Sequence, residues 1–116
     1  MNKVTAKAAV ERLIRRREEL VLTLRHLDKE QADVENNTDW LDQAAYANRA
    51  ALLDRLAEGF QTELQQVDKA LDRIKANRYG QCLACHASID DQRLDAAPEA
   101  AFCSSCQEMR EGLTSV

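Results

Sequence analysis

The sequence predicts a mostly α-helical protein: a long antiparallel coiled-coil hairpin, followed by a small four-cysteine module and a short C-terminal helix. Three observations predict this fold class. Apolar residues recur at heptad spacing through the first two thirds of the chain, a cluster of turn-forming residues interrupts them once, and two Cys-x2-Cys pairs lie near the C-terminus. We expect the hairpin to occupy residues 1–78, with its tip at about 36–44, and the module to occupy residues 79–116, fraying after Glu111.

The first helix of the hairpin is expected between residues 1 and 35, which contain neither glycine nor proline. Two columns of residues repeat every seven positions, as the core-facing positions of a coiled coil do. They are Val10, Arg17, Leu24 and Gln31 in one column, and Leu13, Leu20, Leu27 and Val34 in the other. Two polar residues interrupt this seam, and we expect this helix to be the shorter one or to fray at its start.

Asparagine, threonine and aspartate are concentrated at residues 36–39, and these residue types favour turns and helix N-caps. A second helix is therefore expected to begin at Thr38 or Asp39 and to run for roughly 40 residues, or about 60 Å. Gly59 weakens it by roughly 1 kcal/mol relative to alanine, and Gly80 suits the left-handed residue beyond its end. Its seam alternates steps of four and three residues: Tyr46, Ala50, Leu53, Ala57, Phe60, Leu64, Val67, Leu71 and Ile74. Two such helices joined by a short turn predict an antiparallel hairpin.

Composition agrees with long helices and indicates a compartment. Aromatic residues make up 4% and charged residues 31% of the chain, which suits two-sided helices better than a thick globular core. The first residues contain no apolar run of signal-peptide length, and no stretch approaches the roughly 20 apolar residues of a membrane span. We therefore expect a cytoplasmic protein without membrane association, in which cysteines stay reduced.

The four cysteines predict one structural zinc site. They are spaced Cys82-x2-Cys85-x17-Cys103-x2-Cys106, which is a strong zinc signal in a reducing compartment. Four thiolates fill a tetrahedral Zn²⁺ shell and leave no position for water, so the predicted site is structural rather than catalytic. The segment is too small to hold a core alone, and metal binding would supply most of its folding free energy.

Other interpretations of the cysteines are weaker. Two thioredoxin-like redox motifs would need a βαβ frame, which the neighbouring sequence lacks. His86 directly follows Cys85 and could compete as a ligand, but four cysteines already complete the shell. Redox sensing by the thiolates stays compatible with a structural site.

The charge distribution argues against a zinc finger that binds DNA. Residues 1–78 carry 14 Lys/Arg and 14 Asp/Glu, whereas residues 79–112 carry two arginines and six acidic residues. A DNA-binding surface replaces phosphate counterions with lysine and arginine. The cysteine-rich part is net −4 before any thiolate is counted, so we expect no direct sequence-specific DNA binding.

The expected tip has two interpretations. Asp39 and Asp42 are three residues apart and share one helix face, where carboxylates in a first turn stabilise the helix by opposing its dipole. Alternatively, the pair forms an acidic tip that reaches into a partner. Trp40, the only tryptophan, is either a docking residue or a local cap on the hairpin.

The tip and the cysteine segment together resemble the DksA/TraR family, over a stretch from about Asp39 to Arg110. The tip matches a D-x2-D-x-A motif through Asp39, Asp42 and Ala44. The zinc segment matches the family pattern through Tyr79, Gly80, Cys82, Cys85, Ile89, Arg93, Leu94, Ala96, Pro98, Ala100, Cys103 and Cys106. Either motif alone identifies the family only weakly. The tip motif and the zinc pattern together, separated by one long helix, are highly specific for it. The first helix matches only through its heptads.

This resemblance implies a transcription regulator that binds RNA polymerase. Members of the family insert the hairpin into the secondary channel, bring the tip aspartates near the catalytic centre, and dock the zinc end on the channel rim. Short-lived promoter complexes, such as those of ribosomal RNA genes, are then inhibited in the stringent response, and some amino-acid biosynthesis promoters are activated. We therefore expect a monomer with one Zn²⁺, whose polymerase contacts include Asp39, Trp40, Asp42 and Ala44.

Some positions depart from the family pattern. The family helps to bind the alarmone ppGpp with basic residues that correspond here to Gln66, Ala97 and Gln107. Phosphates need lysine or arginine, so we expect weak or absent ppGpp dependence. The glycine that usually follows the second cysteine is His86 here, which affects the expected geometry of the turn but not zinc binding itself.

Two other classes of function are weighed against transcription regulation. A zinc-dependent coiled-coil adaptor would use the same hairpin on another protein and would leave transcription unchanged. An enzyme is not expected, because no Ser/His/Asp or Cys/His set is evident, the zinc shell is full, and an exposed tip offers no pocket to shift pKa values.

Overall fold

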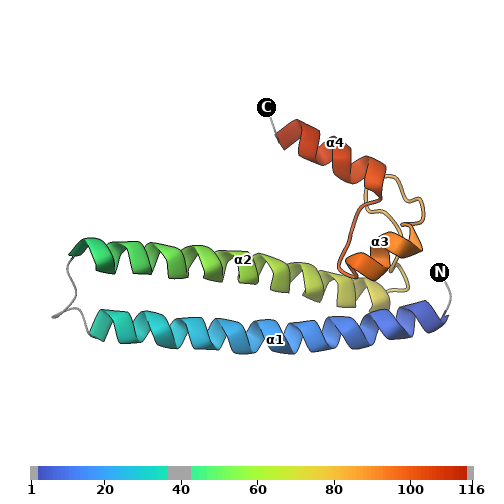
Figure 1. The fold of residues 1–116 in the computed structure, drawn as a ribbon. Coiled ribbons are helices and arrows are strands. Elements are labelled where there is room, and N and C mark those ends of the chain that lie inside the picture. The colour runs from blue at the N-terminus through green and yellow to red at the C-terminus, as the bar shows by residue number, and fades with distance from the viewer. Residues whose placement is uncertain (1–2, 37–42, 115–116) are drawn as a thin grey trace. The chain divides into compact units, whose positions relative to one another are not determined.

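The computed structural model describes residues 3–36 and 43–114 (Figure 1). Its helices are α1 (Lys3–Asn36), α2 (Gln43–Lys75), α3 (Asp91–Ala96) and α4 (Ser104–Thr114). Within these ranges the only β-type pairing is an isolated antiparallel bridge between Gln81 and Ser88, and no helix is both long and apolar enough to span a membrane. The mostly α-helical fold class, with two long helices, a cysteine module and a short C-terminal helix, is confirmed.

Packing divides the chain into two compact units. The base unit combines Met1–Arg16 with Gln66–Val116, and the hairpin unit consists of Arg17–Gln65. Both long helices therefore contribute to both units, and the cysteine module shares the base unit with the first turns of α1 and the last turns of α2. The expected boundary after residue 78, between the long helices and the cysteine module, stays a prediction.

In the hairpin unit, α1 and α2 lie side by side in opposite directions along a narrow apolar seam (Figure 1). Leu27 of α1 and Leu53 of α2 form a buried pair, and Leu20 is 1% exposed. Partly buried residues pack against the pair: Tyr46, Ala57 and Phe60. The seam has the pairing that two heptad-bearing helices need in order to bury their apolar stripes.

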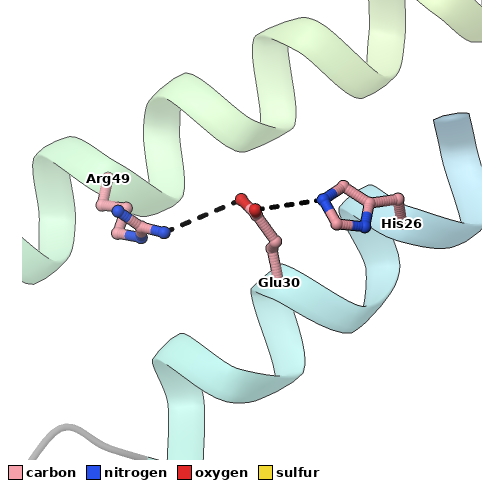
Figure 2. Close-up of polar contacts among 3 residues, drawn as sticks. All are labelled: His26, Glu30 and Arg49. Carbon is pink, nitrogen blue, oxygen red and sulfur yellow. Dashed lines mark ion pairs between the residues drawn. The ribbon is translucent and has the colours of Figure 1, made fainter.

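Polar side chains connect the two helices beside this seam. The side-chain amide of Gln31 donates a hydrogen bond to Oδ1 of Asp54 at 2.6 Å, so a polar seam position is satisfied across the pair. Figure 2 shows Glu30 between two basic side chains: Oε1 lies 3.3 Å from Nε2 of His26 on α1, and Oε2 lies 3.7 Å from Arg49 on α2. Because these groups are largely solvated, the ion pairs contribute little stability.

The buried positions follow the predicted heptads, except that two alanines, Ala9 on α1 and Ala70 on α2, are buried outside the predicted seam. Leu13, Leu20 and Leu27, each seven residues apart, are all buried on α1. On α2, Val67 is 0% exposed as its seam position predicts, but Ala70 is also 0% exposed and lies outside the predicted seam. Heptad spacing does not identify such an alanine, because its burial depends on how closely a neighbouring element approaches.

Two expectations about helix ends are wrong. The first helix does not fray at its start, since α1 is helical from Lys3; that it is the shorter of the two long helices stays a prediction, because only the part of α2 from Gln43 is described. The chain also does not fray after Glu111, because α4 continues to Thr114. The expected start of the second helix, at Thr38 or Asp39, lies outside the described residues.

The end of α2 also differs from expectation, because its left-handed residue is Asn77 rather than Gly80. Asn77 has a φ of 58°, its N–H donates to the carbonyl of Ile74 at 3.1 Å, and the N–H of Arg78 donates to the carbonyl of Arg73 at 2.8 Å. This pair of bonds is a Schellman motif, which satisfies carbonyls that a helix end leaves unpaired. Asparagine tolerates the left-handed region better than most residues, and Gly80 adopts a φ of 84° one turn later.

Candidate metal centre

The first cysteine pair lies in a tight turn that follows α2. The N–H of His86 donates to the carbonyl of Cys82 at 3.0 Å, and the N–H of Cys82 donates to the carbonyl of Ala87 at 2.8 Å. To close this turn, His86 adopts a φ of 64°, a left-handed conformation that glycine adopts readily and other residues adopt at a cost. The side chain of Gln81 donates to the carbonyl of His86 at 3.3 Å. The turn therefore closes with histidine at a position whose backbone favours glycine.

The second cysteine pair lies at the start of α4. Cys103 precedes the helix, Cys106 follows within its first turn, and the N–H of Gln107 donates to the carbonyl of Cys103 at 2.9 Å. Side chains three residues apart share a helix face, and the positive end of the helix dipole favours thiolates. The N–H of Leu83 donates to the carbonyl of Ala101 at 2.9 Å, which connects the two cysteine turns.

These turns bring the four predicted zinc ligands together. The sulfur atoms of Cys82, Cys85, Cys103 and Cys106 all lie within 4.8 Å of one another, and those of Cys85 and Cys103 are 3.8 Å apart. Tetrahedral Zn–S bonds of about 2.3 Å place neighbouring sulfurs about 3.8 Å apart. The cluster thus has the donor set and the size for one structural Zn²⁺. It is the single such group within residues 3–36 and 43–114, and it does not include His86.

The sulfur atoms differ in their affinity for protons. The backbone N–H of Cys85 has the largest influence on Cys82 and, with those of Cys103 and Ala84, lowers the pKa of Cys82 to about 6 against the opposing effect of burial. The thiol of Cys103, followed by those of Cys82 and Cys85, raises the pKa of Cys106 to about 12. Crowded sulfurs cannot all carry negative charge without a cation, so Zn²⁺ binding would displace protons from the cluster.

A small apolar core supports the metal site. Its buried members are Cys82, Ile89 and Leu94. Phe102 packs against this core, its carbonyl accepts a hydrogen bond from Nε of Arg93 at 2.9 Å, and the guanidinium of Arg110 lies 4.2 Å from the centre of its ring. So few buried residues do not hold a segment of this length folded without a metal or a disulfide.

Two arginines from the long helices bind the backbone of the module. Nη1 of Arg12 on α1 donates to the carbonyl of Asp95 at 2.6 Å. Arg73 on α2 donates to the carbonyls of Glu99 and Ala100 at 3.3 and 3.4 Å, and burial lowers the pKa of Arg73. Neither residue can be identified from the sequence, because an arginine on a helix face usually indicates a solvated side chain, and Asp95 lies 83 residues from Arg12.

A cavity of about 530 Å³ lies between the last turns of α2, the segment after α3, and α4. Gln66, Ala97 and Gln107 line it together, and these are the neutral residues found where the resemblance leads one to expect basic ones. The cavity also has charged lining residues: Lys69, Arg73, Arg93, Arg110 and Glu99.

The expected tip residues are mostly beyond the part of the chain that the structure describes. Asp39, Trp40 and Asp42 lie between residues 36 and 43, outside the described ranges. Ala44 is exposed in the first turn of α2. The contribution of these residues to partner binding therefore stays a prediction.

Comparison with known proteins agrees with the arrangement of the cysteines. Residues 77–112 match the prokaryotic DksA/TraR C4-type zinc finger. An uncharacterized protein of Aquifex aeolicus is 29% identical over 114 residues, which cover 93% of this chain and 77% of that protein. The RNA polymerase-binding transcription factor DksA of Escherichia coli K12 is 28% identical over 95 residues, and DksA of Salmonella typhimurium matches equally. That match covers 82% of this chain and 61% of the DksA chain, so the protein spans under two thirds of the DksA length.

A solved structure matches the whole chain. The structure of transcription factor DksA2 from Pseudomonas aeruginosa superposes with a TM-score of 0.88 at 27% identity, covering 100% of this chain and 90% of that one. The match includes the two long helices as well as the cysteine module. The chain is therefore DksA-like in sequence and in fold, and its residues 77–112 match the C4-type zinc finger of the DksA/TraR family.

Proposed function

We propose that this protein is a transcription regulator that binds bacterial RNA polymerase through its secondary channel. Its DksA relatives carry the description RNA polymerase-binding transcription factor. The observation that carries the proposal is the match to DksA2 over 100% of the chain, because it includes the long helices and the cysteine module at once. The protein would act in the cytoplasm, as a monomer and without direct sequence-specific DNA binding.

The proposed mechanism assigns separate tasks to the connection between the long helices and to the metal module. The residues between α1 and α2, with Asp39 and Asp42, would approach the catalytic centre and alter the stability of promoter complexes. The described part of α2 has 33 residues, which corresponds to about 50 Å of helix and would supply the reach. The module would dock at the rim of the channel, and Zn²⁺ would keep it folded there.

We further propose that ppGpp has little or no influence on this activity. The cavity that contains Gln66, Ala97 and Gln107 lacks basic side chains at those three positions. The basic residues that line it elsewhere are Lys69, Arg73, Arg93 and Arg110. Arg73 and Arg93 bind backbone carbonyls, and Arg110 lies over the ring of Phe102. A highly charged nucleotide would have to draw these guanidinium groups away from those partners, which offsets part of its binding free energy.

The tip is tested by Asp42→Asn in transcription from a ribosomal RNA promoter with purified polymerase. We expect this variant to lose inhibition, because the carboxylate that would act near the catalytic centre is gone, while helicity by circular dichroism and zinc content stay unchanged. Asp28→Asn is the matched control: it removes the same charge from an exposed position on α1 and should inhibit like the wild-type protein.

Full inhibition by Asp42→Asn would contradict the proposed role of the tip. Lost inhibition with retained polymerase binding would separate the action of the tip from docking and support the mechanism. If the wild-type protein neither binds polymerase nor changes transcription, a zinc-dependent adaptor that acts on another protein becomes the better account.

A further inference from the structure

The first turns of α1 are ordered although their own sequence supplies little to hold them. α1 begins at Lys3 with no acidic residue in its first turn, where negative charge would favour a helix start. Ala9 and Leu13 are nevertheless 7% and 1% exposed, and Arg12 between them reaches the carbonyl of Asp95 at 2.6 Å. The order of this helix start therefore depends on tertiary contacts within the base unit.

The carbonyls that Arg12 and Arg73 bind belong to one short segment, residues 95–100. Asp95 lies in the last turn of α3, where helix carbonyls lack partners within the helix and attract cations. Arg73 reaches the carbonyls of Glu99 and Ala100, which follow the helix. One arginine from each long helix thus holds the same segment.

That segment is in turn held by the cysteine site. Ala100 packs against the core cluster that contains Cys82, and Cys103 and Cys106 pack there as well. The carbonyl of Ala101 accepts a hydrogen bond from Leu83 in the first cysteine turn. A six-residue helix followed by a short connection has little stability of its own, so its carbonyls keep these positions only while the cysteine turns are closed.

We propose that Arg12 and Arg73 are positioning residues that couple metal occupancy of the four-cysteine site to the order of the first turns of α1. With metal bound, residues 95–100 present their carbonyls to both arginines. Without metal, the arginines lose these acceptors, and residues 9–13 lose the contact that Arg12 makes with residues 95–100. This coupling goes beyond polymerase binding and does not depend on it, because both of its ends lie within the base unit.

Thermodynamic linkage makes the coupling measurable from either end. If bound metal raises the equilibrium constant for the contact between Arg12 and the module by a given factor, then that contact raises the equilibrium constant for metal binding by the same factor. Arg12 is exposed, which limits the size of that factor. A hydrogen bond from a charged donor in this setting corresponds to a change of about three- to tenfold.

The test is amide hydrogen exchange of the full chain, with zinc bound and after its removal by a chelator, for the wild type, Arg12→Ala and Arg15→Ala. In the wild type, we expect chelation to accelerate exchange at residues 9–13 by about tenfold or more, with little change at residues 20–27 of the hairpin unit. In Arg12→Ala, exchange at residues 9–13 should already be about three- to tenfold faster with zinc bound. Arg15→Ala removes the same charge from the next turn and should behave like the wild type.

Zinc affinity, measured by competition with a chromophoric chelator, supplies the second readout. Arg12→Ala should weaken zinc binding by the same factor as it accelerates exchange at residues 9–13. Arg12→Lys keeps the charge but has a different reach, so its zinc affinity should lie between those of the wild type and Arg12→Ala. Arg73→Lys should act in the same direction as Arg12→Ala. Exchange at residues 9–13 that does not respond to zinc in the wild type would overturn the proposal. Wild-type protection and wild-type zinc affinity in Arg12→Ala would also overturn it.

Discussion

The hairpin unit and the base unit are stabilised in different ways. In residues 17–65, similar apolar contacts repeat along two helices, as between Leu27 and Leu53, and polar pairs lie beside them. In the base unit, the helix pair still buries Leu13 and Val67, but the cysteine module has a core of only Cys82, Ile89 and Leu94. Stability is therefore distributed along the helix pair of the hairpin unit and concentrated at one metal site in the cysteine module of the base unit. A change to one residue should have local effects in the first and module-wide effects in the second.

The largest expected effect tests whether folding stability is concentrated at the metal site. Cys103→Ser removes one of four thiolates, and structural Zn²⁺ in small modules is worth on the order of 10 kcal/mol of folding free energy. We expect loss of stoichiometric zinc and unfolding of residues 79–112, whereas most helical circular dichroism from α1 and α2 persists. Ser105→Ala, at an exposed position in the first turn of α4, is the control. A Cys103→Ser variant that keeps one zinc per chain and its thermal midpoint would mean that the four-cysteine site is wrong.

The next effect tests the distributed side of the comparison. Leu20 is 1% exposed, and truncation of a buried leucine to alanine typically costs about 2–5 kcal/mol. Leu20→Ala should lower the stability of the hairpin in urea denaturation without changing zinc content. Leu22 is 63% exposed, so Leu22→Ala, two residues away, should change stability by less than about 0.5 kcal/mol. Equal effects of the two substitutions would show that the seam is assigned to the wrong face of α1.

The two units also differ in how much of them the sequence predicts. The hairpin unit was predictable because its contacts repeat: Leu20, Leu27 and Leu53 follow heptad spacing and are buried. The cysteine cluster was predictable because Zn²⁺ demands four thiolates at short spacing, whatever the rest of the fold. Both signals are local in the sequence.

The features that the sequence did not predict depend on tertiary contacts. Arg12 looks like any solvated helix residue until Asp95 is placed beside it. Ala70 is too small to indicate a core position, yet it is 0% exposed. The expected fraying of the first helix was wrong for the same reason, because the contacts that order its start come from the far end of the chain.

A smaller effect is expected at Tyr79 in the base unit. Its hydroxyl is buried and has no hydrogen-bond partner among the described residues, and burial raises its pKa above the ordinary value of 10.0. Tyr79→Phe should therefore raise the free energy of unfolding by about 1 kcal/mol. Because the folded-state pKa lies above the unfolded one, the wild type should lose stability as pH rises above 10, and the variant should lose less. Urea denaturation at pH 8 and pH 10.5 measures both; a Tyr79→Phe variant less stable than the wild type at pH 8 would reveal a partner for the hydroxyl.

The smallest effect belongs to the hairpin unit. Gly59 lies inside α2, and a Cβ added there would meet no atom within 4 Å. Gly59→Ala should thus stabilise the hairpin by about 0.5–1 kcal/mol, through helix propensity alone. The same change should leave zinc affinity unaltered, because the residue is outside the base unit. A destabilised Gly59→Ala variant would indicate a bend or a close contact at this position.

The most direct test of the proposed function is transcription from a ribosomal RNA promoter with purified bacterial polymerase, in which the zinc-loaded protein is titrated with and without ppGpp. We predict inhibition that increases with protein concentration and that ppGpp barely changes, because Gln66, Ala97 and Gln107 carry no positive charge toward its phosphates. Inhibition that ppGpp strongly enhances would support the proposed role as a transcription regulator, but it would overturn the inference from those three residues. Transcription that stays unchanged at every protein concentration, with and without ppGpp, would contradict the central claim that this DksA-like protein regulates RNA polymerase.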